Sequence, residues 1–233
     1  MTIPLLLLPG LLCDARLWRD VLPALEGVAA PVVADLSHDD SMAAMAARAI
    51  AAMPAGRFAV AGLSMGGYVA FEVLRQARGR VAGLALFDTS ARPDAPEATQ
   101  RRRDLLALSR QGQFRGVTPR LLPSLIHASR LGTPLAQEVM EMADRIGAAA
   151  FLRQQTAIMG RVDSRPDLPG ITVPSLVAVG AEDVLTPPAL AEEMAAGIPG
   201  ARLVRFAGSG HLPTMEVPEA AGAAMREWLA EAA

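Results

Sequence analysis

Six short apolar runs recur along this 233-residue chain, and stretches long enough to form helices separate most of them. The runs are residues 3–8, 31–35, 58–63, 81–87, 175–179 and 202–206. Short, continuous apolar runs are typical of strands buried on both faces, which occur in parallel sheets with helical crossovers. The alternation therefore predicts an α/β fold: a mostly parallel sheet of about six strands with helices on both faces.

One part of the chain departs from this alternation. The helices expected around the sheet are residues 14–25, 41–53, 65–77, 187–196 and 217–230. Between the fourth and fifth strand-like runs there is no further strand, and the helix-like segments there are residues 95–110, 114–124, 135–146 and 148–159. We therefore expect an α/β core formed by residues 1–91 and 166–233, with residues 92–165 inserted as a helical cap. An extra helical layer that only adds stability is the alternative.

Composition limits the partners and the compartment. Hydrophobic residues make up 52% of the chain and charged residues 20%, which favours a globular protein over a disordered one. The net charge of −2 gives no basis for nucleic-acid binding. The first apolar run meets Pro9 and Gly10 too early for a membrane span, and no positive segment precedes it. Because Cys13 has no second cysteine to pair with, we expect a cytoplasmic protein without a membrane anchor.

The insert differs from the rest of the chain in charge. Residues 92–165 carry 12 arginines against 7 acidic residues, a balance of +5, whereas the remainder has a balance of −7. A positive cap over an acidic body could steer an anionic substrate inward. The arginines predicted to bind a substrate carboxylate are Arg101, Arg102, Arg103 and Arg153. Solvated salt bridges on helix faces are the alternative role for them.

A serine lies between glycines where a predicted strand meets a predicted helix. The segment is GLSMGG, residues 62–67, and the strand-like FAVAGL runs into it. Gly62 and Gly66 lack the Cβ atoms that would collide in a very tight strand-to-helix turn. Ser64 can therefore be held in a strained conformation, with its Oγ at the carboxyl edge of the sheet. The pattern predicts a nucleophile, and a serine in a structural turn is the alternative.

A serine hydroxyl needs a base within hydrogen-bonding reach to act as a nucleophile. His211 lies in the loop between the last strand-like run and the last helix, which places it at the same sheet edge as Ser64. His38 lies in a polar loop and His127 in the insert, where surface or packing roles are expected. His211 is therefore the predicted base.

The third group should be a carboxylate that orients the imidazole. Asp183 follows the fifth strand-like run, and serine, then acid, then histidine is one of the chain orders in which such a triad occurs. Glu182 and Asp88 are the alternatives, because Glu182 is adjacent and Asp88 follows the fourth strand-like run.

Acyl transfer also develops a negative oxygen that needs two backbone N–H donors. Met65, directly after the serine, and Leu11, in the loop after the first strand, are the predicted donors. Cys13 has neither a tight turn nor a base placed for it, so a cysteine nucleophile is not expected. We expect no metal and no cofactor, because metal-ligand spacing and phosphate-binding glycine loops are absent from the sequence.

With these motifs assembled, the chain resembles the α/β-hydrolase superfamily over nearly its whole length. It looks most like small bacterial carboxylesterases, enol-lactonases and cofactor-free haloperoxidases. GLSMGG resembles their nucleophile elbow, GAEDVLTPP their acid turn and GSGHLPTMEVPE their histidine loop. Members usually carry His-Gly where this chain has Pro9-Gly10. Their sheet usually has eight strands, and this chain begins at the equivalent of the third, so the resemblance implies six.

The sequence supports three functional hypotheses. The first is a serine hydrolase that cleaves a small ester or lactone through an acyl-enzyme on Ser64. The second is acyl transfer or perhydrolysis by the same three residues, with an alcohol or a peroxide in place of water. The third is a non-catalytic ligand receptor on this fold. A small-molecule substrate is the expected partner in the first two, and the sequence leaves the oligomeric state open.

Overall fold

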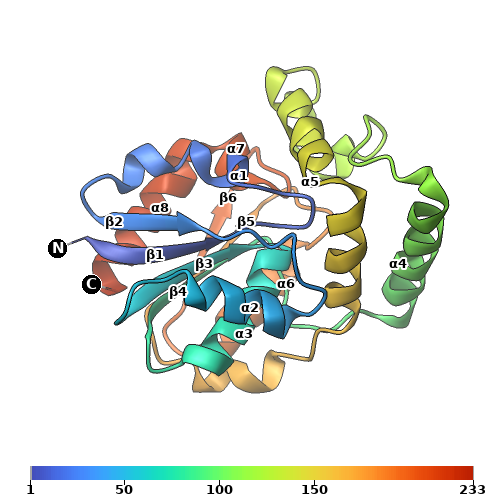
Figure 1. The fold of residues 1–233 in the computed structure, drawn as a ribbon. Helices are drawn as coiled ribbons and strands as arrows, with labels where there is room; N and C mark the ends of the chain where they lie inside the picture. The colour runs from blue at the N-terminus through green and yellow to red at the C-terminus, as the bar shows by residue number, and fades with distance from the viewer. Residues whose placement is uncertain (1, 233) are drawn as a thin grey trace.

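The computed structural model describes residues 2–232, which form a six-stranded sheet (Figure 1). Its strands are β1 (Ile3–Leu8), β2 (Ala29–Val33), β3 (Phe58–Leu63), β4 (Val81–Phe87), β5 (Ser175–Gly180) and β6 (Arg202–Phe206). Every neighbouring pair is parallel, and the order across the sheet is β2-β1-β3-β4-β5-β6. The predicted α/β fold with six strands is confirmed. Because the strands are parallel, their carboxyl ends lie at one edge of the sheet.

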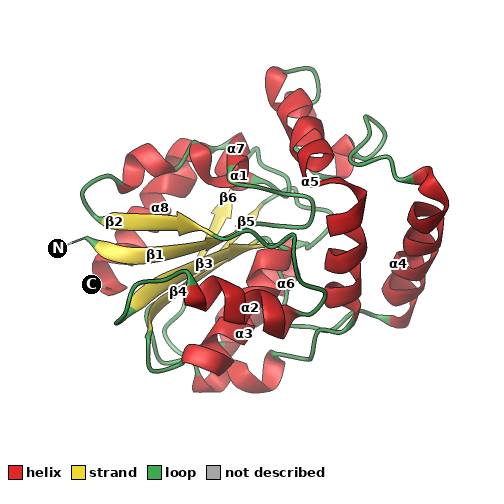
Figure 2. Ribbon diagram, viewed as in Figure 1, coloured by secondary structure: helices red, strands yellow, loops and turns green. Residues whose placement is uncertain are grey.

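Alternate side chains of the central strands pack into two apolar layers on opposite faces of the sheet. In β1, Leu6 and Leu8 belong to one layer and Leu5 and Leu7 to the other, and all four are fully buried. Helices cover both layers, as Figure 2 shows. On the first layer lie α2 (Met42–Ala51), α3 (Met65–Ala77) and α6 (Pro188–Gly197); on the second lie α1 (Arg16–Arg19), a 3₁₀ turn (Leu22–Leu25), α7 (Pro213–Glu216) and α8 (Pro218–Ala232).

Two expected element boundaries were wrong. The single helix expected over residues 14–25 is divided into α1 and the separate 3₁₀ turn, because Pro23 has no N–H to continue a helical ladder. The strand β2 begins and ends two residues earlier than predicted. As an edge strand, β2 is only partly buried, so its apolar pattern marks its ends less sharply than in the central strands.

The insert contains two long helical segments, α4 (Pro96–Leu108) and α5 (Pro134–Met159), joined by irregular chain and short turns (Figure 1). Gly147 interrupts α5 with a φ of 75°, at the point where two helices were expected to meet. The helix expected over residues 114–124 was wrong, because only Leu122–Ser124 forms a 3₁₀ turn. Gly112 and Gly116 adopt positive φ and Pro119 lacks an N–H, so no α-helix continues there. Within residues 2–232, no helix is both long and apolar enough to cross a membrane.

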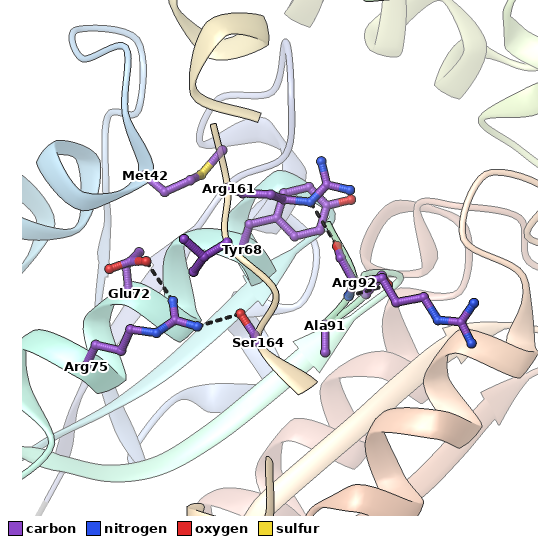
Figure 3. A pocket seen from close by; sticks show the side chains of 10 residues that line it. Met42, Tyr68, Glu72, Arg75, Ala91, Arg92, Arg161 and Ser164 are labelled. Carbon is purple, nitrogen blue, oxygen red and sulfur yellow. Dashed lines mark hydrogen bonds and ion pairs between the residues drawn. The ribbon is translucent and has the colours of Figure 1, made fainter. Parts of the chain in front are cut away.

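The two ends of the insert lie together against α3 (Figure 3). The Ser164 amide donates a hydrogen bond to the Ala91 carbonyl at 2.8 Å, and Arg75 Nη2 donates to Ser164 Oγ at 2.7 Å. The Arg161 guanidinium lies over the ring of Tyr68, 4.2 Å from its centroid. These side chains enclose a cavity of about 10 Å³, which has room for one water molecule at most. This junction therefore anchors the insert and is too small to bind a substrate.

Candidate active site

Ser64 occupies a strained turn between β3 and α3. Its φ of 55° and ψ of −116° lie outside the regions that non-glycine residues normally adopt. A Cβ atom on Gly62 would lie 2.2 Å from the Gly66 carbonyl oxygen, and one on Gly66 would lie 2.0 Å from the Leu8 carbonyl oxygen. Both positions therefore require glycine, as predicted. The turn holds the Ser64 side chain at the carboxyl end of β3 and at the amino terminus of α3.

Hydrogen bonds from β4 hold this turn in place. The Ser64 amide donates to the Phe87 carbonyl at 3.0 Å, and the Thr89 hydroxyl donates to the Ser64 carbonyl at 2.7 Å. Gly67 packs so closely on Thr89 that an added Cβ would lie 2.4 Å from the threonine hydroxyl oxygen. Thr89 is thus a supporting residue that the sequence analysis missed. A hydroxyl residue two positions after a buried strand was the available signal.

Asp183 and His211 form a buried pair at the same sheet edge. His211 Nδ1 and Asp183 Oδ2 are 2.8 Å apart, and the two residues are only 4% and 3% exposed. Thr186 also contacts the carboxylate, because its amide donates to Oδ1 at 3.1 Å and its hydroxyl to Oδ2 at 2.6 Å. Glu182 does not contact His211 but accepts a hydrogen bond from the Ser209 amide at 3.1 Å. Of the two adjacent acids, the structure brings Asp183 to the histidine.

The environment of Asp183 favours its ionised form. Burial by itself raises the pKa of Asp183, but the His211 ring and the hydrogen bonds from Thr186 outweigh it and lower the pKa to about 2. Asp183 is therefore an ionised hydrogen-bond acceptor for His211 over the whole pH range in which ester hydrolysis is normally measured.

This low pKa predicts a pH-dependent contribution to stability. The pKa of about 2 in the folded protein lies below the value of about 3.9 for an unfolded aspartate. Ionised Asp183 should therefore contribute about 2 kcal/mol at neutral pH, and this is lost as the pH falls from about 4 to about 2. Urea unfolding of wild type and Asp183→Asn should show a difference that shrinks over that interval. A difference that is constant with pH contradicts the assignment, and Glu182→Gln is the control.

Asp88 lies beside this pair, at the end of β4. Its carboxyl is fully buried, and Oδ1 accepts a hydrogen bond from the Gly180 amide at 2.8 Å. One ligand atom from each of Asp88, Asp183 and His211 lies within 4.8 Å of the others, which is close enough to hold a metal ion. Two of these atoms belong to a histidine and an aspartate already hydrogen-bonded to each other, so the cluster is better explained without a metal. Asp88 was an alternative for the orienting acid, but within residues 2–232 the His211 ring is hydrogen-bonded to Asp183 and not to Asp88.

The loop after β1 faces the amino terminus of α3. Gly66 packs closely on this loop, since a Cβ added to it would lie 2.0 Å from the Leu8 carbonyl oxygen and 2.8 Å from the Pro9 carbonyl oxygen. This contact fixes the loop against the serine turn. Leu12 has a φ of 58°, and its amide donates to Gln154 Oε1 at 3.1 Å. Within residues 2–232, the backbone amides of Met65 and Leu11 donate no hydrogen bond outside regular secondary structure.

Gln154 is a second supporting residue that the sequence analysis missed. It lies on α5 and is 1% exposed. Its Oε1 accepts from Leu12, and its Nε2 donates to the Leu36 carbonyl at 3.2 Å. One cap side chain therefore joins the loops after β1 and β2. No local pattern marks this residue, because its partners lie more than 100 positions away along the chain.

Glu216 binds the histidine loop to the insert. Its carboxylate is 1% exposed and accepts hydrogen bonds from the amides of Leu212 at 3.0 Å and His127 at 2.6 Å, and from Ser209 Oγ at 3.3 Å. The His211 amide in turn donates to the Leu125 carbonyl at 3.0 Å. The loop that carries the histidine is thus held on one side by residues of the insert.

Replacing Glu216 by alanine is expected to destabilise the protein by about 3 kcal/mol, because it leaves buried amides at His127 and Leu212 without an acceptor. Chemical unfolding measures this change. Glu219→Ala is the matched control, since Glu219 is exposed and lies three residues further on, and it should change stability by less than about 0.5 kcal/mol. Equal effects of the two substitutions contradict the assigned role.

The remaining candidates lie apart from the Asp183–His211 pair or are unreactive. His38 is exposed and pairs with Asp35 at 3.0 Å, and His127 Nδ1 contacts Ser129 Oγ at 2.8 Å. Burial and the neighbouring Asp14 raise the pKa of the Cys13 thiol to about 12, so little thiolate forms at neutral pH. The His127–Ser129 contact is part of the cap of the exposed 3₁₀ turn Ala128–Arg130, where the His127 ring also accepts from the Ser129 amide, and no carboxylate pairs with this ring in residues 2–232.

The arginines of the insert divide into two groups. Arg102 forms an ion pair with Asp94 at 2.7 Å, and Arg153 donates to the Ser37 carbonyl at 2.7 Å. Five arginines are exposed and form no ion pair with any residue in the described part of the chain: Arg101, Arg103, Arg110, Arg115 and Arg120. The positive charge of the insert is therefore concentrated on residues 101–120. Of the four arginines predicted to bind a substrate carboxylate, Arg101 and Arg103 belong to this group.

The arrangement provides the groups needed for nucleophilic chemistry at a carbonyl. A strained hydroxyl, a histidine paired with a carboxylate and two backbone amides all lie at the carboxyl edge of the sheet. Ser64 is linked to the pair through β4, because Thr89 binds its carbonyl and the adjacent Asp88 lies beside Asp183 and His211.

Comparisons with known proteins agree with this architecture. A family model described as "alpha/beta hydrolase fold" matches residues 3–218. A thermophilic esterase from Thermogutta terrifontis superposes with a TM-score of 0.86 at 32% identity, covering 100% of this chain and 91% of its own. An enol-lactonase from Burkholderia xenovorans gives a TM-score of 0.86 at 22% identity, covering 99% and 92%, and shows likeness in fold. A pimeloyl-[acyl-carrier protein] methyl ester esterase from Neisseria meningitidis is 27% identical, covering 96% and 92%.

Proposed function

This chain belongs to the α/β-hydrolase fold family, and from that membership we propose that it is a serine hydrolase of small carboxylic esters or lactones. Relatives and structural neighbours that include esterases support ester hydrolysis in general. The observation that carries the proposal is the strained turn at Ser64. A non-glycine residue is held at a φ of 55° only where the surrounding structure enforces it, and such positions are typical of nucleophiles.

In the proposed mechanism, Ser64 Oγ attacks the carbonyl carbon and its proton passes to His211 Nε2. Asp183 holds the ring by accepting from Nδ1 and stabilises the imidazolium that forms. The amides of Met65 and Leu11 donate to the oxygen that becomes negative. The ester C–O bond then breaks, and His211 returns the proton to the departing alcohol. Water repeats the sequence, releasing the acid and restoring the serine.

Two other functions remain as alternatives. Acyl transfer or perhydrolysis uses the same acyl-enzyme and differs only in the molecule that attacks it. A receptor that binds its ligand without cleaving it is the alternative from another class. The presence of Ser64, Asp183 and His211 at one edge of the sheet favours catalysis over binding alone, because a receptor does not require a strained serine at the same edge as a histidine–carboxylate pair.

A panel of esters and lactones, combined with covalent labelling, tests the proposal. We expect hydrolysis of short-chain p-nitrophenyl esters or lactones, and mass spectrometry after treatment with an alkyl phosphonate should locate the adduct on Ser64. Adding an alcohol or hydrogen peroxide to the assay separates the alternatives, because a transferase forms a new ester or a peracid faster than the free acid. A protein that binds esters but neither cleaves them nor accepts the label contradicts the proposal.

The charge of the cap suggests a second candidate substrate. The Neisseria relative is named for an ester on an acyl-carrier protein, and five unpaired arginines lie on residues 101–120 of this chain. We propose that this surface attracts substrates that carry negative charge, either on the acyl group or on an attached acidic protein. The proposed contacts are Arg101 and Arg103, while Arg102 and Arg153 already have partners.

Replacing Arg101 and Arg103 by glutamine is expected to lower kcat/KM for an anionic ester about 10-fold at low ionic strength, because steering toward the site is lost. The value for a neutral ester of equal length should not change, and high salt should remove the difference. Arg165→Gln is the matched control, since Arg165 already pairs with Asp163. Equal losses for the anionic and the neutral ester contradict the role of these arginines.

A further inference from the structure

The carboxyl of Asp88 has no role in the mechanism above, although it lies within the same cluster as Asp183 and His211. It is fully buried, and its Oδ1 is bound by the Gly180 amide at 2.8 Å. Its Oδ2 has no hydrogen-bond partner in residues 2–232 when both oxygens are treated as acceptors. An unpaired buried carboxylate oxygen is costly, because the oxygen has lost its water and gained no donor. Some group must therefore satisfy Oδ2.

A proton on Oδ2 satisfies that oxygen. A carboxyl oxygen of Asp183 lies within 4.8 Å of one of Asp88, and an acid O–H on Asp88 would place a donor next to that carboxylate instead of a second acceptor. The charged groups that act on Asp88 come from two elements. The turn after β5 contributes Asp183, and α7 contributes Glu216. The third titratable group of the cluster, His211, is already hydrogen-bonded to Asp183, so a second full negative charge at Asp88 would have no cation of its own to compensate it.

The donors around the two carboxyls decide which of them carries the proton. Asp183 accepts from the amides of Leu185 and Thr186, from the Thr186 hydroxyl and from His211. Within residues 2–232, Asp88 accepts from one amide only, that of Gly180. A carboxyl with four donors is stabilised as an anion, whereas a buried carboxyl with one donor is not. In agreement with this, burial and the charge of Asp183 raise the pKa of Asp88 well above its usual range.

We propose that Asp88 is a neutral carboxylic acid in the working protein, and that its Oδ2–H donates a hydrogen bond to the Asp183 carboxylate. Asp88 is then a positioning residue. It receives the Gly180 amide on one oxygen and binds Asp183 with the other, so it fixes both ends of the turn that presents Asp183 to His211. The positioning role rests on the proposed function, but the presence of the neutral acid does not.

Infrared spectroscopy tests the protonation state without any substrate. A neutral carboxylic acid has a carbonyl stretch at higher frequency than a carboxylate, and buried acids are few. The spectrum of wild type at neutral pH minus that of Asp88→Asn should contain one such band, and the band should shift in D₂O. Asp35→Asn is the control, because Asp35 lies in an exposed loop and its substitution should remove no band of this kind. A wild-type spectrum without the band overturns the proposal, whatever the protein hydrolyses.

Kinetics test the positioning role. Asparagine is neutral and can donate from its amide, so Asp88→Asn should keep kcat within about 3-fold and leave the acidic limb of the kcat/KM profile in place. Asp88→Ala removes both hydrogen bonds, so it should lower kcat about 10- to 100-fold with little change in KM. If Asp88 were ionised, Asp88→Asn would remove a negative charge near His211 and move the acidic limb to lower pH. That shift, or full activity of Asp88→Ala, overturns the proposal.

Discussion

Ser64→Ala is expected to lower kcat for ester hydrolysis by about 10⁶-fold, the size of effect seen when the nucleophile of a serine hydrolase is removed. The loss follows from the turn between β3 and α3, which presents the Ser64 side chain at the carboxyl edge of the sheet. Steady-state kinetics with a p-nitrophenyl ester measure the loss, and binding of a non-hydrolysable substrate analogue should remain. Ser129→Ala, on the exposed surface of the cap, is the control and should be fully active.

A second substitution at the same position separates chemistry from strain. Ser64→Gly should be equally inactive, yet its unfolding temperature should exceed that of Ser64→Ala. Glycine adopts a positive φ freely, whereas alanine keeps a Cβ that costs about 1 kcal/mol or more in this conformation. Two variants that unfold at the same temperature would show that the turn stores no strain. Substantial activity in either variant would show that residue 64 is not the nucleophile.

Gly66→Ala is expected to lower kcat at least about 100-fold and to destabilise the protein by about 2 kcal/mol. The new Cβ would lie 2.0 Å from the Leu8 carbonyl oxygen and 2.8 Å from the Pro9 carbonyl oxygen, which are both backbone atoms. The loop after β1 and the amino terminus of α3 must then separate, which would remove the proposed convergence of the Leu11 and Met65 amides on one oxygen. KM should change much less than kcat, because the loss falls on the transition state.

Gly79→Ala is the matched control for this prediction, since a Cβ at Gly79 meets no atom within 4 Å. It should leave both kcat and stability close to the wild-type values. A Gly66→Ala variant with normal kcat would show that the two amides need not approach each other. A variant that loses stability but keeps its kcat would confine the role of Gly66 to packing.

The central strands could be predicted because both of their faces are buried. In β3, β4 and β5 every residue is buried, so the apolar run and the strand have nearly the same limits. The insert was harder to predict, because its helices end where single residues leave the helical backbone conformation and not where the apolar pattern ends. Positive φ at Gly116 and the missing N–H of Pro119 prevent a helix over residues 114–124, where apolar spacing alone suggested one.

Some residues of the candidate site can be recognised from their neighbours in the sequence, whereas others contact partners that are distant along the chain. Ser64 is marked by its flanking glycines, and Asp183 and His211 by their places after strands. Thr186 follows Asp183 by three residues and binds its carboxylate, so a hydroxyl at that spacing was a local signal that could have been used. Gln154 and Glu216 act on residues up to 142 positions away, and only the folded chain brings these partners together.

The attachment of the histidine loop to the insert has a consequence for redesign. The Leu125 carbonyl accepts from the amide of the proposed base, and the His127 amide donates to Glu216, whose carboxylate in turn binds the histidine loop at Ser209 and Leu212. If the whole insert were exchanged for that of a relative to change the substrate range, Leu125 and His127 would be replaced and the histidine loop would lose these contacts. Chimeras should therefore keep residues 122–130 native and exchange α4 together with residues 109–121, a stretch that carries the five arginines without an ion pair in the described part of the chain.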